Sequence, residues 1–326
     1  MMQALKGVRH ISSTAMKQAV SELSVKVPWG EIRGKVWGPE HGHPVLCLHG
    51  WADNCGTFNT LIPLLPKDYQ YVAVDLPGHG RSSHRPPGVP YTFPLYVMDV
   101  CRVVDALQWS KFSIIGHSMG GNIAGIFGAL YPEMVDAIVL LDSFGFLPSS
   151  MKEMSTVIRQ GFDELIQFEK KEQKTIVYTY EKALERLLDA NQTLSEESAK
   201  ILLERGVIEV EGGVIFSRDL RIKLKNIGRI SLEQSLDMQS RIKASVLVLL
   251  ADDGLEKMFD QPELNNYKSA IFQAYRDRNH TLVKVQGSHH VHLNNPEAVA
   301  PLVSDFLQTK VLSHSSTLTN NLTTKL

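Results

Sequence analysis

Residues 115–121 read IGHSMGG, which sets a small hydroxyl between glycines, directly after one apolar run and before another. Residues 116–120 fit the pattern G-x-S-x-G. In this pattern the serine occupies a sharp strand-to-helix turn that exposes its hydroxyl at the carboxyl end of a sheet. Glycines are needed around it because side chains there would collide with the neighbouring strand and helix. The stretch therefore predicts that Ser118 is presented as a nucleophile.

Similar apolar runs recur along the chain and alternate with amphipathic segments. The runs predict strands at residues 22–27, 31–37, 44–50, 69–80, 111–118, 135–143, 244–252 and 280–287. The segments between them predict helices at residues 57–66, 95–108, 119–131 and 295–308. Strands that alternate with helices indicate an α/β fold, with a mostly parallel twisted sheet and helices on both faces.

Residues 146–240 interrupt this alternation. They read mainly as amphipathic helix, with a hairpin at residues 207–218 that turns at Gly212 and Gly213. We expect a helical cap, or lid, inserted into a core made of residues 21–145 and 241–310. The ends of the chain, 1–20 and 311–326, are expected to be disordered.

Composition narrows the classes of function. The 326 residues are 43% hydrophobic and 21% charged, with a formal net charge of −1 and no basic stripe with interleaved aromatic residues. We therefore expect no nucleic-acid partner. No apolar run approaches the roughly 18 residues of a membrane span. The three cysteines, Cys47, Cys55 and Cys101, suit neither a zinc site nor a disulfide framework. No cofactor is implied, and the sequence does not define the oligomeric state.

The two ends carry address-like features. Residues 1–20 contain basic and hydroxyl side chains but no acidic one, a composition shared with mitochondrial transit peptides, although disorder is the favoured interpretation. The final Thr-Lys-Leu differs by one residue from the peroxisomal signal Ser-Lys-Leu. We expect a cytoplasmic protein, with the peroxisome as the alternative.

A serine nucleophile needs a base and donors for an oxyanion. The segment GSHHVHLNNPE, residues 287–297, follows the last expected strand and offers His289, His290 and His292 as the base. The three histidines do not favour a metal site, because the sequence shows no acidic or cysteine neighbour. The backbone N–H groups of Trp51 and Met119 are the expected oxyanion donors.

The residues alone leave the orienting acid open. Asp142 follows the strand after the nucleophile helix, and Asp252 and Asp253 follow the next strand of the core. All three lie where loops leave the same edge of the sheet. Asp75 and His79, in the segment DLPGHGRS (75–82), are interpreted as structural.

Four segments, LHGW (48–51), DLPGHGRS (75–82), IGHSMGG (115–121) and GSHHVHLNNPE (287–297), resemble in their order the α/β-hydrolases that carry a lid. Further segments resemble the animal serine hydrolase-like proteins: VPWGEIRGKVWG (27–38), LHGWADNCGTFNTLIPLLP (48–66), GVPYTF (88–93) and SEESAKILLERG (195–206). The resemblance spans nearly all of the expected globular part and implies an α/β-hydrolase fold.

The resemblance also sharpens the choice of residues. Relatives place the catalytic histidine seven residues before the proline of the PE pair, which implies His289. Many relatives carry the acid where this chain has Gly254. Haloalkane dehalogenase-like relatives instead take it from the strand after the nucleophile helix, and Asp142, 24 residues after Ser118, resembles that arrangement. Since the nucleophile is serine and not aspartate, the resemblance implies acyl chemistry.

These residues predict a serine hydrolase of the carboxylesterase type, acting on a small or lipid-like ester. The alternative is a non-catalytic ligand-binding protein on a hydrolase scaffold, and thioesterase or lyase chemistry would use the same side chains. Large cap side chains would line the acyl pocket or pack within the cap: Met151, Met154, Phe162, Leu165, Phe168, Tyr178 and Tyr180.

Overall fold

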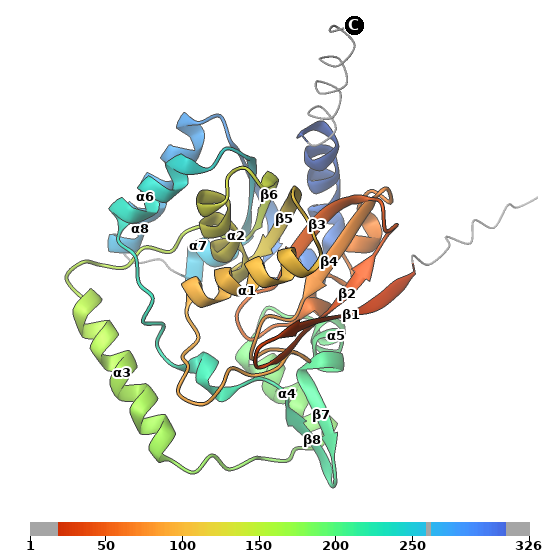
Figure 1. Ribbon diagram of the computed structural model, residues 1–326, viewed down its shortest axis with the longest axis vertical. Coiled ribbons are helices and arrows are strands. Elements are labelled where there is room, and N and C mark those ends of the chain that lie inside the picture. The colour runs from red at the N-terminus through yellow and green to blue at the C-terminus, as the bar shows by residue number, and fades with distance from the viewer. Residues whose placement is uncertain (1–18, 259–261, 311–326) are drawn as a thin grey trace, which may run out of the picture.

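The computed structural model describes residues 19–258 and 262–310, and an eight-stranded sheet forms its centre (Figure 1). The strand order is β1-β2-β4-β3-β5-β6-β9-β10. The strands are β1 (Val20–Val27), β2 (Gly30–Trp37), β3 (His43–Leu48), β4 (Tyr69–Val74), β5 (Phe112–His117), β6 (Val135–Leu141), β9 (Ser245–Asp253) and β10 (Thr281–Ser288). Every strand predicted for the core is confirmed; the ends shift by one or two residues, except that the strand predicted at 69–80 ends at Val74.

Strand pairing divides the sheet into two parts. β1 pairs with β2, and β2 with β4, in the antiparallel sense. From β4 to β10 the neighbours are parallel, as the continuous apolar runs predict. Parallel strands end at a common edge, so the loops after β3, β5, β6, β9 and β10 meet at one place.

Helices cover both faces of the sheet. One face packs against α1 (Phe93–Ala106), α2 (Met119–Leu130), α6 (Leu232–Arg241) and α8 (Pro262–Asp277). The other packs against η1 (Cys55–Phe58), η2 (Ile62–Leu64) and the helical residues 300–310. Figure 1 shows α1 and α2 lying across the middle strands. Successive residues of one strand, such as Leu46 and Cys47 of β3, enter opposite cores.

Two predicted helices differ from the structure. Residues 57–66 do not form an α-helix, because Pro63 and Pro66 cannot donate backbone hydrogen bonds, and two short 3-10 turns form instead. The segment 295–308 begins as a 3-10 turn, η4 (Pro296–Ala298), before the helix at 300–310. The patterns missed α8 and the short helices α7 (Leu255–Met258) and α9 (Val291–Asn294).

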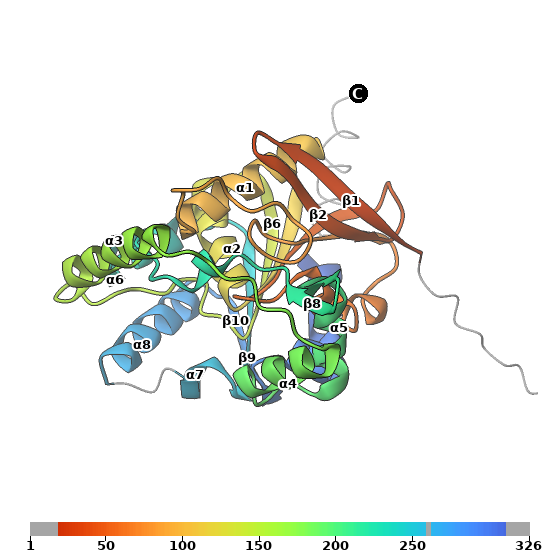
Figure 2. The ribbon, with the colours of Figure 1, turned by 90° about the horizontal axis from the view of Figure 1, so that it is seen from below.

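The segment between β6 and β9 adds no strand to the central sheet. It contains α3 (Met154–Lys170), α4 (Tyr180–Ala190), α5 (Glu196–Gly206), the hairpin of β7 (Val207–Val210) and β8 (Gly213–Phe216), η3 (Leu220–Lys223) and α6. The predicted hairpin is confirmed. Figures 1 and 2 show α4, α5 and the hairpin grouped together, with α3 standing apart. α6 packs on α2 and α8.

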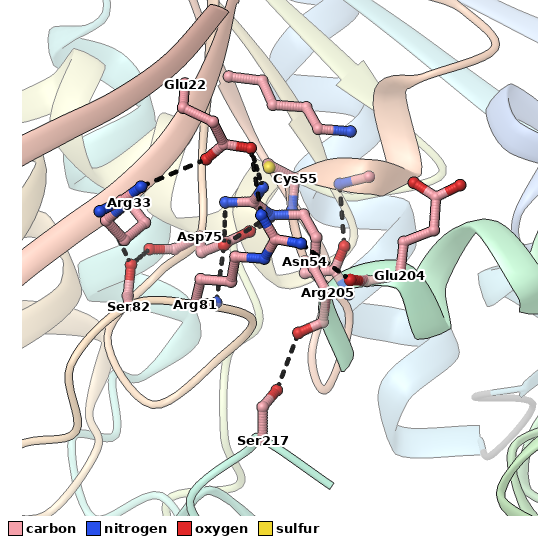
Figure 3. A network of polar contacts seen from close by, with 12 residues as sticks. Glu22, Arg33, Asn54, Cys55, Asp75, Arg81, Ser82, Glu204, Arg205 and Ser217 are labelled. Carbon is pink, nitrogen blue, oxygen red and sulfur yellow. Dashed lines mark hydrogen bonds and ion pairs between the residues drawn. The ribbon is translucent and has the colours of Figure 1, made fainter. Parts of the chain in front are cut away.

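A buried ion pair fastens this segment to the core (Figure 3). Arg205 of α5 is 1% exposed and donates through Nε to Asp75, at the end of β4, over 2.9 Å. Its Nη1 lies 2.6 Å from a carboxylate oxygen of Glu22 on β1. Burial would raise the pKa of Asp75, but Arg205 outweighs it and holds the pKa low. Asp75 is thus occupied by structural contacts.

No helix within residues 19–258 and 262–310 is long and apolar enough to cross a membrane. Residues 1–18, the segment 311–326 and the final Thr-Lys-Leu lie outside the described residues.

His79 is fully buried, and burial, with a contribution from His49, lowers its pKa to about 3. A histidine so enclosed matches its interpretation as a turn residue.

Candidate active site

Ser118 occupies the turn between β5 and α2. Its backbone has φ 50° and ψ −114°, a left-handed conformation that L-residues rarely adopt. A Cβ on Gly116 would lie 2.5 Å from the carbonyl oxygen of Gly120, and one on Gly120 would collide with the carbonyl of Leu48. The glycines of the motif are therefore required by close backbone approach, and strain of this kind is common at functional sites.

Two hydrogen bonds join Ser118, His289 and Asp142 in a row. His289, after β10, has its Nε2 3.0 Å from Ser118 Oγ and its Nδ1 2.6 Å from Asp142 Oδ2. Asp142 is fully buried, and the His289 side chain is 13% exposed. With its Nδ1–H donated to the carboxylate, the neutral imidazole keeps the Nε2 lone pair free for the serine proton. The structure thus brings together the three residues expected to form the triad.

Backbone donors hold the Asp142 carboxylate in place. Its Oδ1 accepts from the N–H of Ala251 over 2.9 Å, and its Oδ2 from that of Leu255 over 2.7 Å. The backbone of Asp142 also has a positive φ of 43°. A Cβ at Gly254 would lie 2.6 Å from the Cγ of Asp142. The Asp142 carboxylate therefore fills the space beside residue 254, the position at which the resemblance to many α/β-hydrolases implied an acid.

The other two candidate acids point elsewhere. Asp252 accepts from the backbone N–H of Gly287 over 2.9 Å, and Asp253 pairs with Lys257 over 3.0 Å. Both side chains are exposed. Of the three aspartates left open by the sequence, Asp142 is the one whose carboxylate hydrogen-bonds to His289.

Trp51 and Met119, the expected oxyanion donors, line the same cavity as Ser118 and His289. Trp51 follows the buried His49-Gly50 pair after β3, and its indole Nε1 donates to the carbonyl oxygen of Ile222 over 2.8 Å. This bond ties the loop after β3 to η3 of the inserted segment.

The cavity above Ser118 has a volume of about 420 Å³. Its apolar wall consists of Trp51, Tyr91, Phe93, Tyr96, Met119, Phe144, Leu147, Ile222, Leu224, Leu255 and Met258. Polar groups enter at Asn122, Asn191, Asn226 and Arg229. None of the seven large cap side chains named above lines it, and two of them, Phe168 and Tyr178, line a different cavity. The apolar lining thus comes mainly from loops and helix ends of the core, namely of α1, α2 and α7, together with η3 and its neighbour Leu224.

Sequence reasoning missed two polar residues behind the row, His117 and Asp53. His117, the second residue of the G-x-S-x-G pattern, is buried, and its Nε2 lies 2.9 Å from the carbonyl oxygen of His289, to which it donates. Burial lowers the pKa of His117 to about 4, so it is neutral near pH 7. The position of His117 inside the motif was the available signal.

Asp53 forms a buried ion pair with His290. Its Oδ2 lies 3.2 Å from His290 Nε2, although 237 residues separate the two. Burial would raise the pKa of Asp53, but His290 and His117 hold it well below its usual range. Burial likewise opposes the protonation of His290, yet Asp53 raises its pKa. The sequence-based reasoning that the histidine cluster has no acidic neighbour is therefore wrong.

In the part of the chain that the structure describes, one group of side chains could hold a metal ion: Asp53, His117 and His290. Possible ligand atoms of Asp53, His117 and His290 lie within 4.8 Å of one another. The ion pair with His290 already compensates the charge of the Asp53 carboxylate without a metal ion. The expectation of no metal stays a prediction.

Comparisons with known proteins match this architecture. The sequence pattern of the α/β hydrolase fold matches residues 43–296. The chain is 56% identical to a serine hydrolase-like protein of Danio rerio over all of both chains. It is 40% identical to serine hydrolase-like protein 2 of Homo sapiens, over 91% of this chain and 97% of that one.

Solved structures agree. A hypothetical protein of Pseudomonas aeruginosa superposes with a TM-score of 0.78 at 28% identity, covering 88% of this chain and 99% of that one. A thioesterase domain from the curacin biosynthetic pathway gives a TM-score of 0.73 at 25% identity, covering 87% and 99%. The chain therefore belongs to the α/β-hydrolase family and, within it, to the serine hydrolase-like proteins.

Proposed function

We propose that this protein is a serine hydrolase that cleaves carboxylic esters through an acyl-enzyme. Its family membership supports a hydrolase in general terms. The observation that carries the finer proposal is the row of two hydrogen bonds, Ser118 Oγ to His289 Nε2 and His289 Nδ1 to Asp142 Oδ2. Such a row supplies the base and the orienting acid that a serine nucleophile needs.

In the first half-reaction, Ser118 Oγ attacks the ester carbonyl carbon while His289 Nε2 takes the hydroxyl proton. The carbonyl oxygen becomes an oxyanion, and the N–H groups of Trp51 and Met119 would stabilise it, each donor being worth about 3 kcal/mol in related sites. The imidazolium of His289, stabilised by Asp142, then protonates the leaving alkoxide. The products are an alcohol and the acylated serine.

Water completes the cycle. His289 takes a proton from water as its oxygen attacks the acyl carbon, and a second oxyanion forms in the same place. Its collapse returns the proton to Ser118 Oγ and releases the carboxylic acid. Asp142 stays ionised throughout and keeps the imidazole in the tautomer that the serine requires.

The cavity supports small or lipid-like esters as substrates. Its volume of about 420 Å³ lies in the range of small-molecule sites, roughly 300–1,000 Å³. Most of its wall is apolar, and removal of apolar substrate surface from water contributes about 25 cal/mol of favourable free energy per Å². We expect nitrophenyl esters of medium chain length to give a higher kcat/KM than the acetate. Activity confined to the acetate would contradict this substrate class.

Fluorophosphonate labelling tests the nucleophile directly. The purified full-length protein should label stoichiometrically, with the adduct on Ser118 by mass spectrometry and none on Ser118→Ala. Ester hydrolysis should disappear in the same variant. A folded wild-type sample that neither labels nor hydrolyses esters would refute the proposal and favour a non-catalytic ligand-binding protein. Product analysis would separate ester cleavage from thioester or lyase chemistry.

A further inference from the structure

A second and larger cavity, of about 940 Å³, opens between the inserted segment and the core loop that contains residues 84–88. It lies between the connection from α3 to α4, the hairpin strand β8 and η3. The end of that connection is fixed, because Tyr178 exchanges two backbone hydrogen bonds with Val214 of β8 at 2.9 and 2.8 Å. The wall is thus held by secondary structure. Figure 1 shows this connection running from α3 to the hairpin.

Positive charge dominates the lining of this cavity. The cations are Lys171, Lys174, Arg186, Arg218, Arg221 and Lys223. The carboxylates are Glu169 and Asp219. Asp219 is already engaged by Arg221, which lies 2.6 Å away and also donates to backbone carbonyls at Arg85, Pro86 and Val89. The remaining five cations face one carboxylate, in a chain whose formal net charge is −1.

Three of these cations form a group without a carboxylate partner. No carboxylate within residues 19–258 and 262–310 lies at ion-pairing distance from Arg186, Arg218 or Lys223. The Nε of Arg218 is buried and has no hydrogen-bond partner in that part of the chain. Burial, then the charge of Arg186, lowers the pKa of Arg218. Burial and both arginines lower the pKa of Lys223. The positive charges of Arg186, Arg218 and Lys223 therefore destabilise one another, and a bound anion would compensate them.

Aromatic rings hold the two guanidinium groups in position. Arg218 lies over the ring of Phe216 at 4.5 Å, and Arg186 over that of Tyr178 at 5.2 Å. The two rings contact each other edge to face, with centroids 5.8 Å apart. A guanidinium stacked by its face still presents its N–H donors at the edge, in the fork that matches phosphate oxygens.

We propose that this cavity binds a small organic phosphate, with the phosphate group held by Arg186, Arg218 and Lys223. The group of three like charges favours a multiply charged anion over a single carboxylate. A volume of about 940 Å³ accommodates a nucleotide-sized ligand. A concave site with an aromatic wall suits a small molecule better than a membrane surface. The proposal does not depend on the hydrolase activity.

The cavity adjoins the candidate active site through η3. Arg221 and Lys223 face the basic cavity, whereas Ile222, between them, lines the cavity above Ser118 and accepts the indole bond of Trp51. The two sites therefore share one short wall but no lining residue.

Calorimetric titration of the full-length protein with pyrophosphate and with ATP tests the proposal. We expect one site, with Kd between roughly 10 and 500 μM at low ionic strength, and weaker binding as salt is added. The double variant Arg186→Gln/Arg218→Gln should weaken binding at least about tenfold. The matched control is Lys182→Gln, one turn earlier on α4 and outside the cavity lining, which should bind as the wild type does.

Lys223→Gln guards against misfolding of the double variant, because this exposed side chain can be changed without loss of packing. It should weaken binding about threefold to tenfold while leaving the thermal unfolding midpoint unaltered. The absence of binding at roughly 5 mM of either probe would overturn the proposal. Equal affinity in the wild type and in Lys223→Gln would overturn it as well.

Discussion

Gly254→Ala would test the position of the Asp142 carboxylate without replacing any of the three proposed catalytic side chains. The added Cβ would lie 2.6 Å from the Cγ of Asp142, whereas ordinary contacts begin near 3.4 Å. The carboxylate must therefore retreat by roughly 1 Å, and its 2.6 Å bond to His289 Nδ1 would lengthen beyond hydrogen-bond range. Gly254 does not have a positive φ, so alanine adds no backbone strain.

The expected loss follows from these distances. A misplacement of about 1 Å at a catalytic group costs on the order of 10²-fold, and removal of the proper acid costs about 10⁴-fold. We therefore expect kcat for ester hydrolysis to fall by about 10² to 10⁴, equivalent to roughly 3–5 kcal/mol of activation free energy. KM should change little, because the lining that would contact the acyl group stays intact.

Steady-state hydrolysis of a nitrophenyl ester and the rate of fluorophosphonate labelling would both be measured. Gly206→Ala is the control, since its Cβ would meet its nearest neighbour, Asn54 Nδ2, at an ordinary 3.7 Å. Asp142→Asn sets the scale for complete loss of the acid. If Gly254→Ala keeps kcat within about threefold while Asp142→Asn is inactive, the steric reasoning is wrong. Full activity in Asp142→Asn would remove Asp142 from the mechanism.

Three further outcomes are expected. Burial lowers the pKa of His79 to about 3 and of His117 to about 4. As the pH falls below about 6.5, the unfolded chain therefore takes up protons before these two buried histidines do in the folded chain. The free energy of unfolding should drop by several kcal/mol between pH 7 and pH 4.5. His290 opposes part of this drop, because its ion pair with Asp53 raises its pKa. Urea unfolding at the two pH values measures this, and a constant or rising stability would contradict it. Arg205→Met leaves Asp75 buried without its cation and should cost about 3–5 kcal/mol, whereas adding Asp75→Asn should recover part of the loss; a cost below about 1 kcal/mol would count against the ion pair as the fastening. Trp51→Phe removes the indole donor to η3 and should lower kcat by up to about tenfold while fluorophosphonate labelling remains stoichiometric, and unchanged kinetics would show that the bond does not position the loop.

The core strands could be predicted from the sequence because a strand that is buried on both faces requires a continuous apolar run, as in β5 and β9. It failed at residues 57–66, where prolines override an apolar helical spacing. It also missed α8, whose amphipathic pattern lies between the last two strands of the core. Local signals of period and turn chemistry were enough for most elements, and boundaries shifted by a few residues.

The polar contacts of the site depended on long-range pairing, which sequence spacing does not reveal. The ion pair of Asp53 with His290 joins residues 237 apart. Neither residue carries a local sign of the other, so the histidine cluster looked isolated from any acid. By contrast, Ser118 was predictable because its turn needs glycines within two residues on each side.

The contact between Asp142 and His289 shows that the carboxylate at one place in the site can come from either of two neighbouring strands. β6 and β9 are adjacent and parallel, with Leu141 paired to Leu249, so the loops after both strands open at one edge of the sheet. A carboxylate can therefore reach the Nδ1 of the histidine from the end of either strand, provided that the other strand leaves room. Here Asp142 takes the place and residue 254 is glycine. Glycine at residue 254 therefore does not deprive His289 of a carboxylate partner, because Asp142 makes the contact with its Nδ1 from the neighbouring strand.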